Sequence, residues 1–487
     1  MLYNENFIHT GAKFPPVCEI SRLKKYAENR LLFNGNTEQV LRSYKERITN
    51  IITKFTDVPI TFKSDINYFK LLTLKTGDLV CGEPITLSTD DSKKDMLDEF
   101  KNYVDFDGKL LESVYDVSRL GESIIRICED ENRKGNIIVC NPDMWFPVCN
   151  RENIRDIKVH IIAWIDETEI NGKAVKILKV QKHYKGYYIK ETYVINNSER
   201  VTEVMPDGEN ISYECYTVGP KIAESGKDKI DTGLSDFAIV QLTGTTMPDD
   251  IHGIDDYDAI TSLVAELEVR YALESVILDK HTAPTMYANE RAFTVDRITG
   301  EFSVNTGGVI PVGADENPPG YITWDASLQA NHYMIEQLEK KINSLSEMGA
   351  VIDDSAFGNS QGYEALEIRM TNARLKARRL TNKLTKPVKK IIELLSELWG
   401  SKIEANDVSI FWNDGIPNSE FRESSIANLK SSFFSNGTIL KQHFGLSEEE
   451  AAEEVEKKQD ENIDSLGGGF GLGVNIPRDT MSNENDE

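Results

Sequence analysis

Residues 253–284 read GIDDYDAITSLVAELEVRYALESVILDKHTAP. Apolar residues recur three and four positions apart, which predicts one amphipathic helix over residues 255–280. Its apolar stripe consists of Ile260, Leu263, Val264, Leu267, Tyr271 and Leu278. Its charged residues are mostly acidic, with seven Asp and Glu against Arg270 and Lys280. Such a helix needs an apolar partner along one side only.

A second helix pattern lies further along the chain, over residues 326–348, with Asp325 or Ser327 as its predicted cap. Its apolar stripe consists of Leu328, Ile335, Leu338, Ile342 and Leu345. Between the two helices, residues 281–325 are irregular and strand-like, with Gly307-Gly308 and Pro318-Pro319-Gly320 as turn signals. The sequence therefore predicts two helices that are joined by a small β-rich insert.

The longest helix pattern runs over residues 363–399, after a polar, glycine-flanked loop at 349–362. We expect Pro387 to kink this helix, because its ring removes a backbone donor and crowds the preceding turn. Residues 368–392 carry nine Lys and Arg and no acid. Four of these cations recur every seven residues and share one helix face: Arg369, Lys376, Lys383 and Lys390. Two readings stay open for this face: solvent or an acidic helix of the same chain, or a polyanion or acidic neighbouring subunit.

The first 254 residues are predicted to be a mixed α+β block. Helix patterns occupy 19–33, 37–56, 64–80, 92–104 and 107–120, with Asn36 or Thr37 and Asp107 as caps. Period-two patterns follow at 123–129, 136–140, 156–166, 173–185, 187–196, 211–217 and 237–243. Because turn signals and not helices separate these strands, we expect an antiparallel meander rather than a doubly wound sheet.

Composition excludes several classes of protein. The chain has 487 residues, a net charge of −25 and 40% hydrophobic residues, which indicates an acidic, folded, multi-part protein. No apolar run is long enough for a membrane span, and the N-terminal residues lack a signal-peptide pattern. The six cysteines form no C-x-x-C pair, so we expect reduced thiols and a reducing compartment. The acidic total argues against a protein that coats DNA.

Sites of catalysis are poorly supported. Residues 77–82 have the glycine spacing of a phosphate loop, but Glu83-Pro84 stands where Lys-Ser/Thr is required. Asp353-Asp354 could form a metal pair, although adjacent carboxylates in a polar loop are usually solvated. We therefore predict no enzyme activity, no cofactor and no metal. The alternatives are a metal-dependent nuclease or hydrolase that uses Asp353 and Asp354, and an acidic scaffolding or adaptor protein.

Several stretches together resemble the portal (head–tail connector) proteins of tailed double-stranded DNA bacteriophages. They are LKTGDLVCGEPITLS at 74–88, the stretch at 253–284, SQGYEALEIRMTNARLKARRLTNKL at 360–384, and residues 421–461. The likeness covers about residues 1–461, and the order of the segments is more specific than any one of them. The resemblance implies an α+β portal-type subunit that forms a ring. It would have a mixed α/β wing, paired stem helices, a small β-rich clip, a long kinked helix and a helical crown.

The resemblance also implies a division of the chain. The parts would be the wing (1–254), first stem helix (255–280), clip (281–325), second stem helix (326–348), tunnel loop (349–362), long helix (363–399), wing and crown (400–461) and a disordered acidic tail (462–487). The loop would contact DNA through Asp353, Asp354, Ser355, Phe357, Asn359, Ser360 and Gln361. The acidic stem would line the channel with Asp255, Asp256, Asp258, Glu266 and Glu268. The basic face would meet a neighbouring subunit, and the clip would dock partners through Glu290, Arg291, Arg297 and Glu301.

The partners that the resemblance implies are those of a packaging machine. They are eleven further copies in a dodecameric ring, double-stranded DNA, the large terminase subunit, the major capsid and scaffolding proteins, and neck or adaptor proteins. The ring would assemble in the host bacterial cytoplasm and reside at the portal vertex of the virion, without a membrane. An acidic channel lining would repel the duplex and keep it mobile.

Overall fold

The computed structural model describes two compact units, residues 1–416 and 417–487. The described residues are 4–55, 66–170, 173–204, 210–222, 228–282, 285–287, 293–295, 298, 302–304, 320–322, 328–352, 368–413, 435, 437–438 and 451–458. The chain is mixed α and β, as predicted. In the second unit, residues 451–458 are helical. All six cysteines are free, and no described helix meets the length and apolarity of a membrane span.

The N-terminal helices agree closely with the sequence patterns. They are α1 (Ile20–Phe33), α2 (Thr37–Val40), α3 (Arg42–Phe55), α4 (Tyr68–Cys81), α5 (Asp91–Tyr103) and α6 (Phe106–Leu120). Two predictions were wrong in detail. The helix expected at 37–56 is divided at Leu41, whose backbone leaves the helical region. Asp107 lies inside the first turn of α6, and Asp105 occupies the N-cap position.

The predicted antiparallel meander is confirmed. A seven-stranded sheet has the order β1-β9-β8-β7-β6-β5, with β10 paired to β8. Its strands are β1 (Lys13–Phe14), β5 (Trp145–Cys149), β6 (Ile157–Ile170), β7 (Lys173–Tyr184), β8 (Tyr187–Val204), β9 (Asn210–Lys221) and β10 (Lys229–Asp231). A separate sheet orders β11 (Ile239–Thr243), β3 (Glu122–Glu129) and β4 (Gly135–Cys140). Strand β5 was missed because Pro147 interrupts its pattern.

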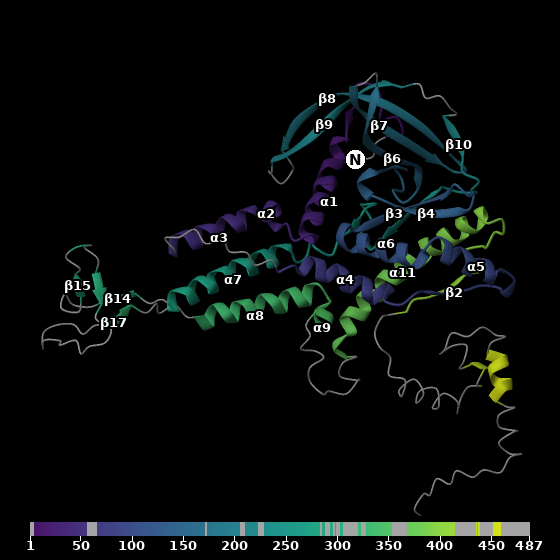
Figure 1. Cartoon of the computed structure of the whole chain (residues 1–487). Coiled ribbons are helices and arrows are strands. Elements are labelled where there is room, and N and C mark those ends of the chain that lie inside the picture. The colour runs from purple at the N-terminus through teal and green to yellow at the C-terminus, as the bar shows by residue number, and fades with distance from the viewer. Residues whose placement is uncertain are drawn as a thin grey trace, which may run out of the picture. The chain divides into compact units, whose positions relative to one another are not determined.

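Two helices lie side by side beyond the sheets, α7 (Thr261–Thr282) and α8 (Leu328–Leu345) (Figure 1). The first begins six residues later than the predicted start at 255. Between them, β14 (Thr285–Tyr287) pairs with β17 (Gly320–Ile322), and β15 (Phe293–Val295) pairs with β16 (Phe302–Val304). The predicted caps Asp325 and Ser327 lie outside the described residues.

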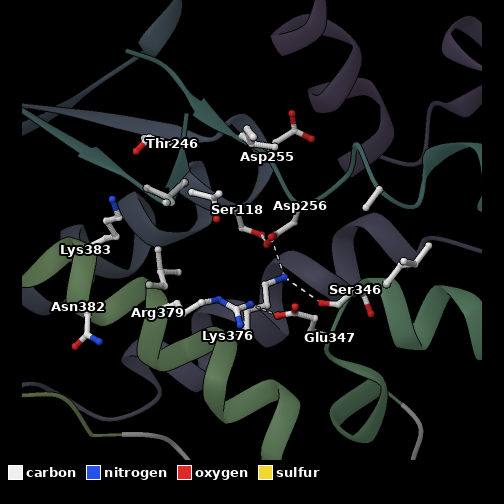
Figure 2. Close-up of a pocket in the computed structure, with 17 residues that line it drawn as sticks. Ser118, Thr246, Asp255, Asp256, Ser346, Glu347, Lys376, Arg379, Asn382 and Lys383 are labelled. Atoms are coloured by element: carbon white, nitrogen blue, oxygen red, sulfur yellow. Dashed lines mark hydrogen bonds and ion pairs between the residues drawn. The ribbon is translucent and has the colours of Figure 1, made fainter. Parts of the chain in front are cut away.

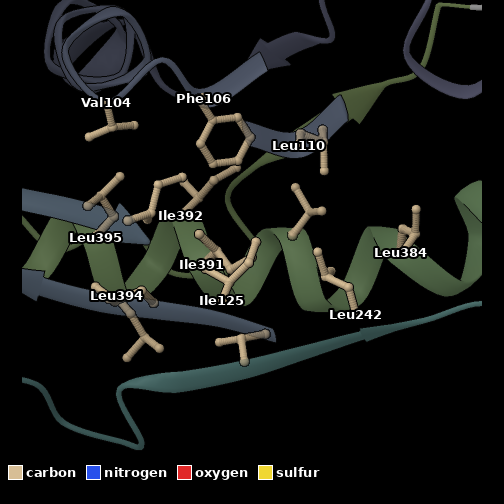
Figure 3. Packing of buried hydrophobic residues seen from close by; sticks show 14 of the residues in the cluster. Val104, Phe106, Leu110, Ile125, Leu242, Leu384, Ile391, Ile392, Leu394 and Leu395 are labelled. Atoms are coloured by element: carbon tan, nitrogen blue, oxygen red, sulfur yellow. The ribbon is translucent and has the colours of Figure 1, made fainter. Parts of the chain in front are cut away.

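The long helix α11 (Thr371–Leu398) is the central element of the larger core. It continues through Pro387. Its apolar stripe packs against α5, α6 and the three-stranded sheet, as Figure 3 shows for Leu384, Ile391, Ile392 and Leu395. Burial of so many aliphatic side chains, at about 25 cal/mol per Å² of apolar surface, makes this contact a main source of stability. The short pair β2 (Thr86–Ser88) and β18 (Ser409–Phe411) closes one side of this region.

A second core joins α4, α7, α8 and the N-terminal part of α11. It contains Phe69, Tyr257, Val264, Leu338 and Met370, all buried. The short helix α9 (Gly349–Ile352) follows α8, and its Val351 and Ile352 pack against this core. The beginning of the predicted loop at 349–362 is therefore helical and packed.

Candidate functional site at the base of α7 and α8

A cavity of about 630 Å³ lies where α11 passes the base of α7 and the end of α8 (Figure 2). Its other wall is the end of α6 and the short hairpin β12 (Thr245–Thr246) and β13 (Gly253–Ile254). The polar side chains around it come from all of these elements. Those labelled in Figure 2 are Ser118, Thr246, Asp255, Asp256, Ser346, Glu347, Lys376, Arg379, Asn382 and Lys383.

Two glycines bring the backbone of β13 against the end of α6. A Cβ on Gly253 would lie 1.9 Å from the carbonyl oxygen of Gly121, and one on Gly121 would lie 2.2 Å from that of Gly253. Gly121 also has φ +87°, which disfavours any other residue. This close approach fixes residues 255–258 beside α6, where the backbone N–H of Asp256 donates to the carbonyl of Ser118 at 2.8 Å.

Asp256 and Lys376 join three elements at the cavity. The Lys376 ammonium lies 2.8 Å from Asp256 Oδ1, and it donates to the carbonyl of Ser346 at 3.2 Å. The Ser118 hydroxyl donates to Asp256 Oδ2 at 2.6 Å. The base of α7, the end of α8 and α11 are thus held together by one cation and one carboxylate.

Asp255 shapes the turn that precedes α7. Its Oδ1 accepts the backbone N–H groups of Tyr257 and Asp258, both at 3.0 Å. Its Oδ2 lies 2.9 Å from the ammonium of Lys25, which is also 3.1 Å from Asp258. Burial lowers the pKa of Lys25, but the two carboxylates more than offset that effect, so its pKa is raised. Tyr257 completes the anchor with a 2.7 Å hydrogen bond to Thr73.

The two predicted channel acids on α7 itself pair with α3. Glu266 lies 2.6 Å from Arg47 and 2.8 Å from Arg270. Glu268 is only 1% exposed and lies 3.0 Å from Lys45. The sequence predicted that these acids, with Asp255, Asp256 and Asp258, present negative charge to a channel. Within the subunit each of the five has a cation partner, and Asp255 and Glu268 are buried. Their place along a channel stays a prediction.

The predicted basic face of α11 divides into paired and unpaired cations. Lys376 pairs with Asp256, and Lys390 lies 3.2 Å from Asp236 and 3.1 Å from Glu393. These two were expected to reach another subunit, and they instead find acids in their own. Arg369 and Lys383 are exposed, and Lys383 has no ion pair among the described residues.

The loop and clip predictions fall on residues outside the description. These are Asp353, Asp354, Ser355, Phe357, Asn359, Ser360 and Gln361 in the loop, and Glu290, Arg291, Arg297 and Glu301 in the clip. Both sets stay predictions. Among the residues that are described, no group of His, Cys, Asp and Glu could hold a metal ion.

Sequence reasoning missed the side chains that complete the cavity. Arg379 pairs with Glu347 at the end of α8, and the Ser118 hydroxyl binds Asp256 from the last turn of α6. No spacing rule links these residues, because they come from helices that meet only in the folded chain. The glycines at 121 and 253 were the available signal, since a glycine between two elements often marks a close backbone approach.

A second buried polar cluster was also missed. Glu122 is fully buried at the start of β3, where it accepts hydrogen bonds from Tyr26 at 2.6 Å and Gln241 at 2.7 Å. His252 Nδ1 lies 2.9 Å from the same carboxylate. Burial raises the pKa of Glu122, but His252 and the other partners more than offset it, so the pKa is lowered. This cluster joins α1, β3, β11 and the segment before β13.

Comparison with known proteins defines the class. The family model of phage portal proteins matches residues 20–465, nearly the whole chain, and the chain therefore belongs to the phage portal proteins. The matching model is described as "Phage portal protein, SPP1 Gp6-like". The family predicted by resemblance is thereby confirmed. A search of curated proteins finds no match.

Two solved structures are similar to the chain. One is titled "Virion of native gene transfer agent (GTA) particle", with 10% identity and a TM-score of 0.42, covering 78% of this chain and 89% of that chain. The other is titled "Neck of native GTA particle computed with C12 symmetry", with 11% identity and a TM-score of 0.40, covering 77% and 87%.

Proposed function

We propose that this portal protein forms a ring at one vertex of a phage capsid and conducts double-stranded DNA during packaging and ejection. The observation that carries the proposal is the family match over residues 20–465. The paired helices α7 and α8 and the long helix α11 are the elements that the resemblance assigned to the stem and to the helix behind the tunnel loop. The ring is proposed to contain twelve copies of the 55.0 kDa chain.

A ring at a capsid vertex would contact the packaging, capsid and neck proteins. The clip, with Glu290, Arg291, Arg297 and Glu301, is proposed to dock the large terminase subunit and then neck or adaptor proteins. The wing is proposed to contact the major capsid and scaffolding proteins. ATP hydrolysis belongs to terminase in this scheme, and the portal itself is not an enzyme. Assembly is proposed to take place in the host cytoplasm and the finished ring to reside in the virion.

The ion pairs reduce the negative charge that these acids would present to DNA in the proposed channel. The exposed member of the acidic set is Asp258, whose side chain is 66% exposed even beside Lys25. Neutralised acids neither attract phosphate nor repel it strongly, so a lining that includes Asp256 and Glu266 would leave the duplex free to slide. The loop residues 353–361 are proposed to make the transient contacts with the moving duplex.

Imaging of the purified full-length chain tests the ring. Mass photometry and negative-stain microscopy should show closed rings with a central channel, and a mass of twelve chains. A chain that remains monomeric at micromolar concentration, and also when it is expressed with its capsid protein, would contradict the proposal. Closed rings with one subunit more or fewer would change only the copy number.

A further inference from the structure

Beside the cavity at the base of α7 and α8 lie exposed lysines that form no ion pair within the described part of the subunit. On α11, Lys383 is exposed and lies at its edge, and Lys386, one turn further, is exposed too. Neither has an ion pair among the described residues. In a chain with a net charge of −25, they place uncompensated positive charge next to the cavity. They mark a surface where an acidic group would gain attraction without displacing an existing partner.

Exposed apolar side chains border the same cavity. Leu345 at the end of α8 is 55% exposed, and Ile254 in β13 is 38% exposed, and both line it. Val117 and Leu380 form apolar parts of its floor. A concave surface that combines apolar walls with a few polar groups is typical of a binding site.

The shape and charge of the cavity favour a protein segment over nucleic acid. A cavity of about 630 Å³ admits one or two side chains, but not a duplex. The two carboxylates on its inner wall are already paired, Asp256 with Lys376 and Glu347 with Arg379, so they add no net charge there. The aliphatic side chains of Leu345 and Ile254 can form neither a hydrogen bond nor an ion pair with a phosphate group. An amphipathic segment that carries an Asp or Glu beside an aliphatic residue would satisfy both parts of the surface.

We propose that this cavity receives an acidic, partly apolar segment of the next copy of the chain, with Lys383 and Lys386 as the cations that meet it. The inference rests on the proposed ring. In such a ring every contact is heterologous, so one surface of each subunit must receive a different surface of the next subunit. Identical subunits of charge −25 repel one another, so the contact between them requires a local basic surface. The unpaired lysines beside the cavity supply it, whereas Lys376 and Lys390 are occupied within the subunit.

Charge reversal tests the lysines. Lys383→Glu together with Lys386→Glu should raise the concentration for half-assembly of rings about tenfold or more, as loss of a central interface contact does. The matched control is Arg151→Glu with Lys158→Glu, two exposed cations far along the chain from the cavity. The control should assemble like the parent chain. Circular dichroism and thermal unfolding of the monomers should be unchanged in both, because none of the four side chains is buried.

A second pair of variants tests the apolar wall. Leu345→Ser should weaken assembly, and Met247→Ser should not, since Met247 is also an exposed apolar side chain but lies outside the cavity lining. Rings assembled from a mixture of ¹⁴N and ¹⁵N chains, treated with a carbodiimide, should give a mixed-isotope crosslink between Lys383 and an Asp or Glu. That crosslink would also identify the partner segment.

The outcomes separate this inference from the proposed function. If the parent chain forms no rings, the portal proposal itself fails. If the parent forms rings and the lysine and leucine variants form them equally well, the cavity is not a subunit contact. That result overturns the inference and leaves the proposed ring unaffected. Rings that assemble normally from the lysine variant but retain less DNA would assign these cations to nucleic acid and would likewise overturn it.

Discussion

Lys376 Nζ lies 2.8 Å from Asp256 Oδ1, and this pair connects the long helix α11 to the base of α7. The seven-residue repeat left open whether Lys376 meets an acid of its own chain or another subunit, and the resemblance to the portal family favoured the second. In the structure its ammonium instead meets the carboxylate of its own chain and the carbonyl that ends α8. The pair is only 14% and 20% exposed at its two side chains, so it is screened little by solvent.

Removing one partner of this pair should be costly. Lys376→Met leaves the carboxylate of Asp256 with the Ser118 hydroxyl but without a cation, and should lower the free energy of unfolding by about 1–3 kcal/mol. Urea unfolding followed by circular dichroism measures the change. Lys383→Met is the control and should alter monomer stability by less than about 0.5 kcal/mol.

A double-mutant cycle then separates the pair from its surroundings. The loss in Lys376→Met combined with Asp256→Asn should be smaller than the sum of the two single losses, because each single change leaves one charge unpaired. Strict additivity would show that the two groups are not coupled, in contradiction to the structure.

Gly253 should tolerate no side chain. In Gly253→Ala the new methyl group would lie 1.9 Å from the carbonyl oxygen of Gly121, so β13 and α6 would have to separate. We expect a loss of more than about 2 kcal/mol, in the range of overpacked cores. Gly11→Ala is the comparison, since its φ of +88° is strained but no atom lies within 4 Å. Its loss should be about 1 kcal/mol, and equal losses in the two variants would refute the argument.

Two buried histidines predict a loss of stability in acid. Burial lowers the pKa of His160 to about 3, and burial with nearby Arg126 lowers that of His183 to about 3. Between about pH 6.5 and 3 the unfolded chain binds protons at these residues and the folded chain does not. Stability should therefore fall as the pH drops through this window, by up to about 1.4 kcal/mol per pH unit for each histidine.

The variant His160→Gln isolates one of these contributions. Its amide oxygen can still accept the hydrogen bond that Trp145 Nε1 donates to His160 Nδ1 at 3.1 Å. Unfolding free energies measured between pH 7 and 4 should show a shallower slope in the variant than in the parent chain. Parallel slopes would mean that His160 binds a proton in the folded state.

Deletion of residues 353–361 should separate ring formation from DNA movement. The deletion begins after Ile352, because Val351 and Ile352 pack against the core of α4, α7 and α8 and belong to the fold. Rings should form with the parent's yield, and packaging of DNA into capsids should fall by at least tenfold. A deletion that abolishes rings would assign the loop to the subunit interface and not to the duplex.

Periodicity predicted the helices, the meander and the apolar stripe of α11, because burial imposes those patterns on the chain directly. It failed for the charged residues. The seven-residue repeat placed Arg369, Lys376, Lys383 and Lys390 on one face, but it contains no information about which acid each cation meets. Asp236, Asp256 and Glu393 come from three different elements, and only folding brings the first two to α11. The turn before α7 was predicted as helix because Asp is favoured at helix N-termini as well as in turns, and Asp255 alone does not separate the two.

The two cores share one helix. Leu384, Val388 and Ile391 of α11 belong to the core with α5 and α6, while Met370 and Ala373 belong to the core with α4, α7 and α8. Ala377 contacts both. Neither core can lose its share of α11 without exposing the other, so these two cores should melt together in one calorimetric transition. Because α11 contributes to both cores, there is no boundary between them along which one could unfold while the other stays folded.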